Sequence, residues 1–156
     1  MNTPTDPLSS YQPYDRDNYS PQESIGYLLK RVGAVLTLSM DRHLSRFDLT
    51  HAQLGIFIKL LHGEANTAAD LARELLTDTG AMTRMLDRLE EKGLVQRTRS
   101  CADRRVVQVE LTAKGRQMAD DIIGVAIDNL NHHLRGFNAD EVAQFKGFLR
   151  RMIANT

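Results

Sequence analysis

The sequence predicts a mainly α-helical fold with one small β-hairpin. Apolar residues recur at helical spacing through most of the 156 residues, and only four prolines interrupt them. Residues 94–99 and 105–111 instead carry β-forming side chains, with a short loop at 100–104 between them. A chain of this length can hold one well-buried domain, or a small domain with dimerisation arms.

Residues 1–20 show no helical period. They hold three prolines and three tyrosines among polar side chains, so we expect a flexible or loosely packed arm. An alternative is that Tyr11, Tyr14 and Tyr19 anchor the arm on a partner subunit, because aromatic side chains are common anchors at interfaces.

Two helices are predicted next. Apolar residues spaced i, i+3, i+4, i+7 indicate a long amphipathic helix over 21–47, with Ser20 as its N-cap and Pro21 in its first turn. Thr50 opens a second helix, which Gly63 ends.

Capping residues also delimit the third and fourth helices. Thr67 and Asp70 form a predicted capping box for the third helix. Asp78 caps the fourth, and Gly93 follows its end. The fourth helix is predicted to have two distinct faces. Its apolar face consists of Met82, Met85, Leu86 and Leu89, and its opposite face consists of Gly80, Ala81, Arg84 and Arg88.

The last part of the chain is predicted to be helical again. Thr112 caps a long helix that breaks around Gly136. Asn138 and Glu141 then form a capping box for the last helix. Together the elements between residues 50 and 111 are two short helices, a tight turn, a longer helix and a hairpin, which is the order of a winged helix-turn-helix.

Composition excludes several classes of protein. Twenty basic and twenty acidic side chains balance, which argues against indiscriminate coating of nucleic acid. The single cysteine excludes an internal disulfide, and adjacent His132 and His133 point about 100° apart, so we expect neither a metal nor a cofactor. No catalytic constellation stands out, so an enzyme is not expected. Without a membrane span or signal sequence, we expect a cytoplasmic protein.

The fourth helix and the hairpin carry residues suited to DNA. A major groove admits one α-helix, whose N-terminal half reads base edges. Small or polar residues and one arginine fill that half, namely Thr79, Gly80, Ala81, Thr83 and Arg84. Arg88, one turn later, is expected at the DNA backbone.

The hairpin holds four arginines against one acid, the arginines being Arg97, Arg99, Arg104 and Arg105. A hairpin tip is slim enough to deliver an arginine into a narrow minor groove. Asp103, the acid, is expected to orient an arginine, although it could equally serve only to start the turn.

This stretch is similar to the core of the MarR family of bacterial transcription regulators, which share a D-x-R wing and an L-T-x-x-G start to the next helix. Residues 103–105 match the first motif and residues 111–115 the second. The resemblance implies a single domain over 21–156, with dimerisation helices at 21–47 and 112–156 and a DNA-binding lobe at 50–111. It also implies a homodimer on a palindromic operator, with Arg105 in the minor groove.

The same resemblance implies a repressor that a small phenolic or anionic aromatic compound releases from DNA. His43, Arg46, His51 and His62 lie near the expected junction of the two lobes and could meet such an anion. One alternative is redox control through Cys101, whose arginine neighbours favour the thiolate. Another is a protein interaction module that does not bind DNA, for which the arginine-rich wing would have little use.

Overall fold

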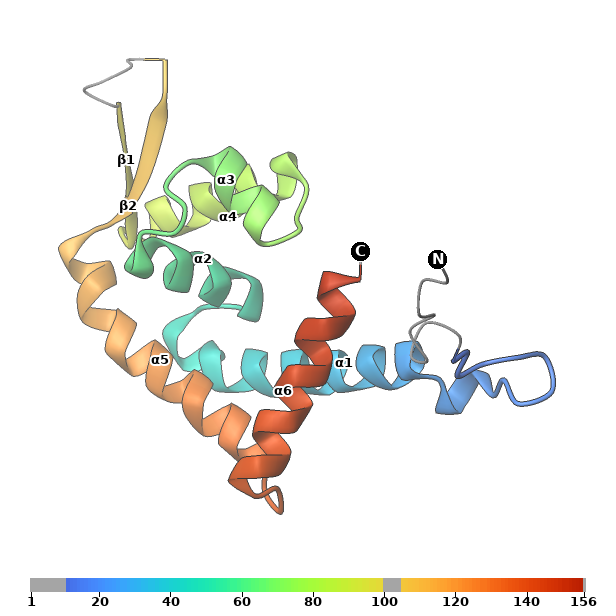
Figure 1. The fold of residues 1–156 in the computed structure, drawn as a ribbon. Coiled ribbons are helices and arrows are strands. Elements are labelled where there is room, and N and C mark those ends of the chain that lie inside the picture. The colour runs from blue at the N-terminus through green and yellow to red at the C-terminus, as the bar shows by residue number, and fades with distance from the viewer. Residues whose placement is uncertain (1–10, 100–104, 156) are drawn as a thin grey trace, which may run out of the picture. The chain divides into compact units, whose positions relative to one another are not determined.

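The computed structural model of the chain describes residues 11–99 and 105–155. Its elements are mostly helices, with one antiparallel hairpin of two strands, which confirms the predicted fold class (Figure 1). The elements are α1 (Ile25–Leu44), α2 (His51–His62), α3 (Ala68–Glu74), α4 (Thr79–Glu91), β1 (Val95–Arg99), β2 (Val107–Leu111), α5 (Ala113–His133) and α6 (Ala139–Ala154), with short 3-10 turns at Pro21–Glu23 and Ser45–Phe47. The chain divides into two compact units, Met1–Val35 and Leu36–Thr156.

The first helix is shorter than the predicted span of 21–47. At its start, Ser24 has an extended backbone and its N–H donates to the carbonyl of Pro21, so that Pro21–Glu23 form a separate 3-10 turn. At its end, Asp48 adopts a left-handed conformation with φ 56°, which stops the second 3-10 turn. Both boundaries therefore depend on backbone conformations that hydrophobic periodicity does not reveal.

The described part of the N-terminal arm has local structure. The Tyr14 hydroxyl accepts a hydrogen bond from the Ile25 N–H at 2.9 Å, and the Tyr14 and Tyr19 rings meet edge to face at 5.9 Å. The Asp15 carboxylate accepts from the backbone N–H groups of Asp17 and Asn18, each at 2.9 Å. Residues 11–20 all remain exposed, so these contacts shape the arm without burying it.

The predicted helix caps are present except at Ser20, whose side chain makes no capping hydrogen bond. Thr50 forms a full capping box with Gln53, and Asn138 forms one with Glu141. The predicted box at Thr67 is only half formed, because the carboxylate of Asp70 accepts from the Thr67 hydroxyl at 2.7 Å and not from its backbone N–H. Caps are local interactions, which is why the sequence locates them well.

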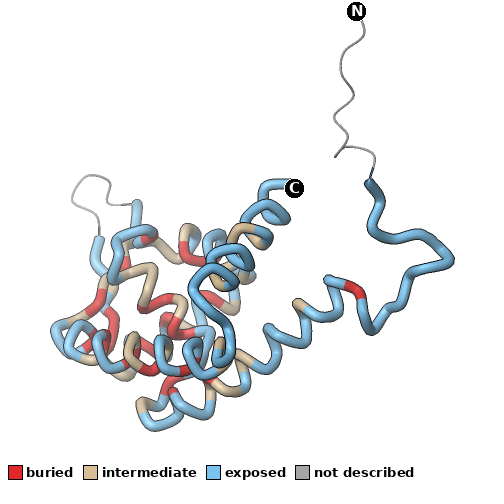
Figure 2. The backbone as a smooth tube through the Cα atoms, turned by 60° about the horizontal axis from the view of Figure 1, so that its bottom comes forward, coloured by how far each residue is buried: buried red, intermediate tan, exposed pale blue. Residues whose placement is uncertain are grey.

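The core of the second unit is formed by the end of α1, by α2, α3, α4 and the hairpin, and by the middle of α5; Figure 2 shows its buried residues in red. Its largest fully buried side chains include Phe57, Leu71, Leu86 and Ile122. The segment before α3 also bonds to the hairpin, since the Val109 N–H donates to the Asn66 carbonyl at 2.7 Å. By contrast, α6 contains no buried residue. None of the described helices is long and apolar enough to cross a membrane.

The start of α5 lies against the end of α4. The Thr112 N–H donates to the Leu94 carbonyl at 3.1 Å, and the Thr112 hydroxyl donates to the Gly93 carbonyl at 2.7 Å. A Cβ atom on Gly115 would lie 2.1 Å from the Leu94 carbonyl oxygen. Only glycine permits this approach.

We therefore predict that Gly115→Ala lowers the free energy of unfolding by about 3 kcal/mol, because backbone must move to admit the methyl group. The control is Gly124→Ala, also within α5, where a Cβ atom meets nothing within 4 Å. That change should raise stability by about 0.5 to 1 kcal/mol through helix propensity. Urea unfolding measures both, and equal stabilities of the two variants would contradict the prediction.

Candidate nucleic-acid interface

The N-terminal half of α4 presents an exposed face of small and polar residues. Met82, Leu86 and Leu89 are buried on the opposite side of the helix. Thr79, Gly80, Thr83 and Arg84 are exposed, and Ala81 is half-buried. The predicted separation of a packing face and an outer face is therefore present.

Two side chains on this face have defined positions. A Cβ atom on Gly80 would lie 3.4 Å from Nη1 of Arg84, so the guanidinium of Arg84 lies back over Gly80 toward the start of the helix. The Thr83 hydroxyl donates to the Thr79 carbonyl at 2.9 Å, which leaves its methyl group and its oxygen lone pairs for an outside contact. The start of the helix is closed by Asp78, which accepts from the Ala81 N–H at 2.9 Å. The face thus offers one cation beside small side chains.

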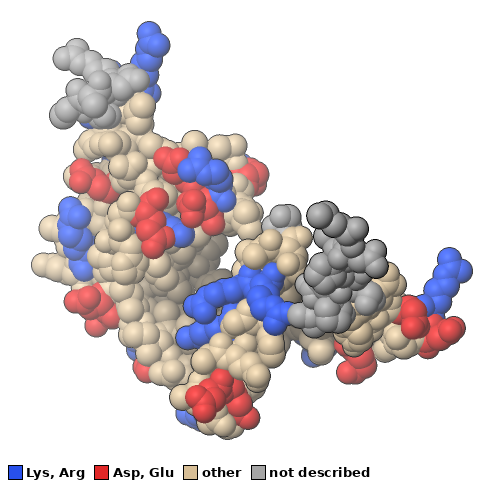
Figure 3. All heavy atoms as spheres, viewed as in Figure 1, with Lys and Arg blue, Asp and Glu red and all other residues tan. Residues whose placement is uncertain are grey.

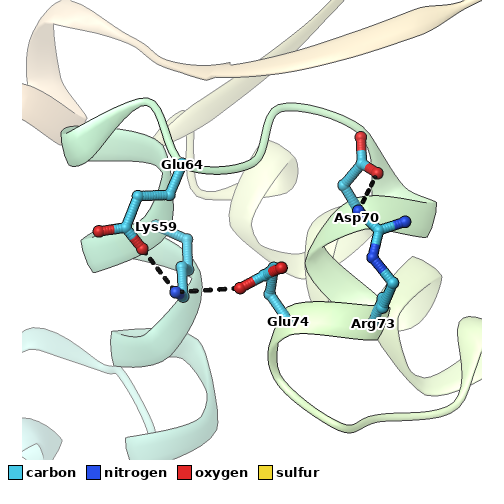
Figure 4. A network of polar contacts seen from close by, with 5 residues as sticks. All are labelled: Lys59, Glu64, Asp70, Arg73 and Glu74. Atoms are coloured by element: carbon cyan, nitrogen blue, oxygen red, sulfur yellow. Dashed lines mark hydrogen bonds and ion pairs between the residues drawn. The ribbon is translucent and has the colours of Figure 1, made fainter.

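Ion pairs fix α3 against α2 (Figure 4). The Lys59 ammonium contacts the Glu64 carboxylate at 2.5 Å and the Glu74 carboxylate at 3.3 Å, and Arg73 pairs with Asp70 at 2.7 Å. The hydrogen bond from Lys59 holds the pKa of Glu64 below its usual value. The Thr67 hydroxyl, and then Arg73, lower the pKa of Asp70. The acidic side chains of this region are therefore paired with cations.

The wing is tied to α4 through Arg97. Its guanidinium contacts the Asp87 carboxylate at 2.7 Å and the Glu90 carboxylate at 2.5 Å, and its backbone N–H donates to Glu90 at 3.2 Å. Burial lowers the pKa of Arg97, but the hydrogen bonds to Asp87 and Glu90 outweigh it and raise the pKa above its usual value. The strands pair from Val95 opposite Leu111 to Arg99 opposite Val107. Arg97 thus points back to α4 and holds the wing against that helix.

The other predicted wing residues lie near its free end. Arg99 and Arg105 are both exposed and flank the segment 100–104. Figure 3 shows basic side chains at this end of the hairpin, which Figure 1 shows extending beyond α3 and α4. Cys101, Asp103 and Arg104 lie outside the described residues.

Described residues of the second unit line two cavities considered as ligand sites. The larger, of about 660 Å³, is between the α1–α2 junction and α4, and its lining is Asp41, Ser45, Asp48, Leu49, Thr50, Gln53, Met85, Arg88 and Lys92. The smaller, of about 270 Å³, lies between α1 and the end of α5, and its lining is Ser39, His43, Asp128, Asn129, His132 and Arg135. No group of three potential metal ligands occurs among the described residues.

Of the four predicted ligand residues, one lines either of these two cavities. His43 lines the smaller cavity. The His51 backbone N–H donates to Asp41 at 2.6 Å, Arg46 lies over the Phe47 ring at 4.8 Å, and His62 ends α2. Arg88, which is predicted to contact the DNA backbone, is exposed and also lines the larger cavity. Met85 and Lys92 also line the larger cavity and were not predicted as ligand contacts. A cavity lining combines elements far apart in the chain, so no local sequence pattern identifies its residues.

Comparisons with known proteins agree on one family. The model of the MarR family matches residues 49–107. The multiple antibiotic resistance protein MarR of Escherichia coli is 32% identical over 130 residues, which cover 83% of this chain and 90% of that protein. The HTH-type transcriptional repressor Rv2887 of Mycobacterium tuberculosis is 32% identical over 128 residues, covering 82% of this chain and 92% of the relative.

A solved structure agrees with these relatives. The crystal structure of a cysteine-to-serine mutant of MarR from E. coli, complexed with operator DNA, superposes with a TM-score of 0.75 at 31% identity. The match covers 82% of this chain and 92% of that one.

We predict that the double variant Asp87→Asn, Glu90→Gln loosens the wing, because Arg97 loses both of its carboxylate partners. Amide hydrogen exchange in β1 and β2 should speed up at least severalfold, with little change in α2. Glu91→Gln, an exposed neighbour without a described ion pair to Arg97, is the control. Unchanged exchange in the double variant would show that Arg97 does not hold the wing.

Proposed function

The chain belongs to the MarR family, and we propose that it acts as a homodimeric repressor that leaves a palindromic operator when a small aromatic or phenolic anion binds. Members of this family regulate transcription and are not enzymes. One relative is named a transcriptional repressor, and another has been crystallised with operator DNA. Both relatives support the proposal that this chain binds operator DNA.

The observation that carries the proposal is the exposed face of α4. Its small residues, Gly80 and Ala81, allow the helix backbone to approach base edges closely. Arg84, which lies over Gly80, can donate two hydrogen bonds to a guanine edge or contact a phosphate. Thr79 and Thr83 complete the contacts that this face can make with a major groove.

The wing supplies the second contact. Arg99 and Arg105 are exposed at its free end, beside residues 103 and 104 of the D-x-R motif. We assign Arg105 to the minor groove, where the negative potential attracts a guanidinium. Arg97 acts by position, since its two bonds to α4 set the angle between the wing and the recognition helix.

Exposed apolar surface supports the homodimer. No residue of α6 is buried, yet α6 carries Phe145, Phe148, Met152 and Ile153, which are 40%, 49%, 44% and 70% exposed. On α1, Leu28, Val32 and Val35 are also about half exposed. A second copy of the chain would cover such surface with the same surface of its own.

The larger cavity is the proposed effector site. Its two cations are Arg88 and Lys92, and Lys92 already pairs with Asp48 at 3.0 Å. Arg88 is therefore the better partner for an anion, and Met85 offers it an apolar neighbour. Because Arg88 and Met85 belong to α4, a ligand there would act directly on the recognition helix. His43, Arg46, His51 and His62 remain predicted ligand contacts, and of these His43 lines the smaller cavity.

Arg105→Ala should weaken binding to duplex DNA from the region upstream of the protein's own gene by about 1 to 3 kcal/mol, because a minor-groove contact is lost. Fluorescence anisotropy measures the affinity, and sedimentation checks that the dimer is intact. Arg116→Ala, which removes an exposed arginine from α5, is the matched control. Equal affinities of the two variants would contradict the role of Arg105.

Phe148→Glu should shift the protein from dimer to monomer, because a charge replaces a large apolar side chain in the proposed interface. Lys146→Glu, on the same helix, also introduces a carboxylate and should leave the dimer in place. Sedimentation velocity at micromolar concentration distinguishes the two. A monomeric wild type, or a dimeric Phe148→Glu, would overturn the assignment of α6 to the interface.

A further inference from the structure

Leu76, in the turn between α3 and α4, combines two unfavourable features. Its side chain is 95% exposed, although it is large and apolar. Its backbone is left-handed, with φ 50°, a conformation in which the Cβ atom of an ordinary residue is crowded. Leu76 is the only apolar non-glycine residue with positive φ in the part of the chain that the structure describes.

The left-handed conformation itself has a structural reason. The Leu76 N–H donates to the Arg73 carbonyl at 3.3 Å, and the Thr77 N–H donates to the Ala72 carbonyl at 2.9 Å. These two bonds form the Schellman motif that ends α3, and the residue at this position normally is glycine. The same chain does use glycine after α2 and α4, at Gly63 and Gly93, with φ 66° and 67°. Leucine at the third site therefore calls for a separate explanation.

The fold gives leucine no benefit at this position. The neighbouring Leu75 packs against the core, and its Cδ2 atom lies 3.0 Å from where a Cβ atom on Gly55 would be. Leu76 instead points into solvent, so it gains no stabilisation from burial while its backbone is held in an unfavourable conformation. Such an exposed and strained residue indicates a contact with something outside the chain.

We propose that Leu76 makes an apolar contact with operator DNA, at a deoxyribose or a thymine methyl group on the edge of the major groove. The inference rests on the proposed function, in which the start of α4 enters that groove. Leu76 precedes Thr79, the first residue of α4, by three positions, so it lies beside the end of the helix that meets DNA. Thymine methyl groups are the apolar feature of the major groove.

The charges around this turn agree with a DNA contact. The acidic residues of α3, Asp70 and Glu74, are paired with Arg73 and Lys59. Phosphates approaching the turn therefore do not face unpaired carboxylates from α3. Asp78, the remaining acid, accepts the hydrogen bond that caps α4.

Three variants test the contact on the full-length protein. Leu76→Gly removes the side chain and the backbone strain, Leu76→Asn keeps a left-handed backbone with a polar side chain, and Leu76→Met keeps an apolar side chain of similar size. The DNA probe is the duplex from upstream of the protein's own gene. Anisotropy gives the affinity, and thermal unfolding gives the stability of each variant.

We expect affinity and stability to change in opposite directions. Leu76→Gly and Leu76→Asn should bind about fivefold or more weakly, because apolar surface is no longer buried against DNA. Their melting temperatures should stay level or rise by up to about 4 °C, because both residues adopt the left-handed conformation readily. Leu76→Met should bind within about twofold of wild type.

The other outcomes overturn the inference. Wild-type affinity in Leu76→Gly would show that Leu76 does not touch DNA. If that variant also lost repression in cells, the turn would contact a protein instead. Weaker binding accompanied by a lower melting temperature in both variants would indicate a structural role. If the wild type bound no DNA, the proposed function itself would fail.

Discussion

The hydroxyl and the N–H of Thr112 donate to the carbonyls of Gly93 and Leu94, and Gly115 lets the first turn of α5 lie against that backbone. This one contact joins the end of α4, the start of β1, the end of β2 and the start of α5. Lys114 adds a bond from its ammonium to the Lys92 carbonyl at 2.8 Å. These contacts hold α4 and the wing to each other, which suits the two DNA contacts proposed for them.

Charge is arranged so that a neutral chain can bind a polyanion. Twenty basic and twenty acidic side chains balance overall. Carboxylates near the proposed interface form ion pairs within the chain: Asp87 and Glu90 contact Arg97, and Glu64 and Glu74 contact Lys59. The outer face of α4 and the free end of the wing keep Arg84, Arg99 and Arg105 at the surface. Local pairing, and not net charge, thus prepares the surface for DNA.

The larger cavity lies between α4 and the α1–α2 junction, so its lining includes residues of both. Lys92 at the end of α4 bonds to the backbone carbonyl and the carboxylate of Asp48, whose left-handed conformation separates the two helices. Asp41 at the same junction accepts from the start of α2 at 2.6 Å. A ligand that disturbs either acid would therefore change how α4 is held, which gives the proposed effector a physical route to DNA affinity.

The sequence by itself determined the helices and their caps at Thr50, Asp78, Thr112 and Asn138, because these depend on neighbours within four residues. It also indicated the hairpin, because two runs of β-forming residues flank a short loop. The outward face of α4 also followed from helical periodicity. Only the tertiary structure decided that Arg97 faces two carboxylates of α4, and that Leu75 packs inside while Leu76 is exposed. These contacts depend on elements distant in sequence and on the backbone angles of single residues. Residue type and spacing predict neither of them.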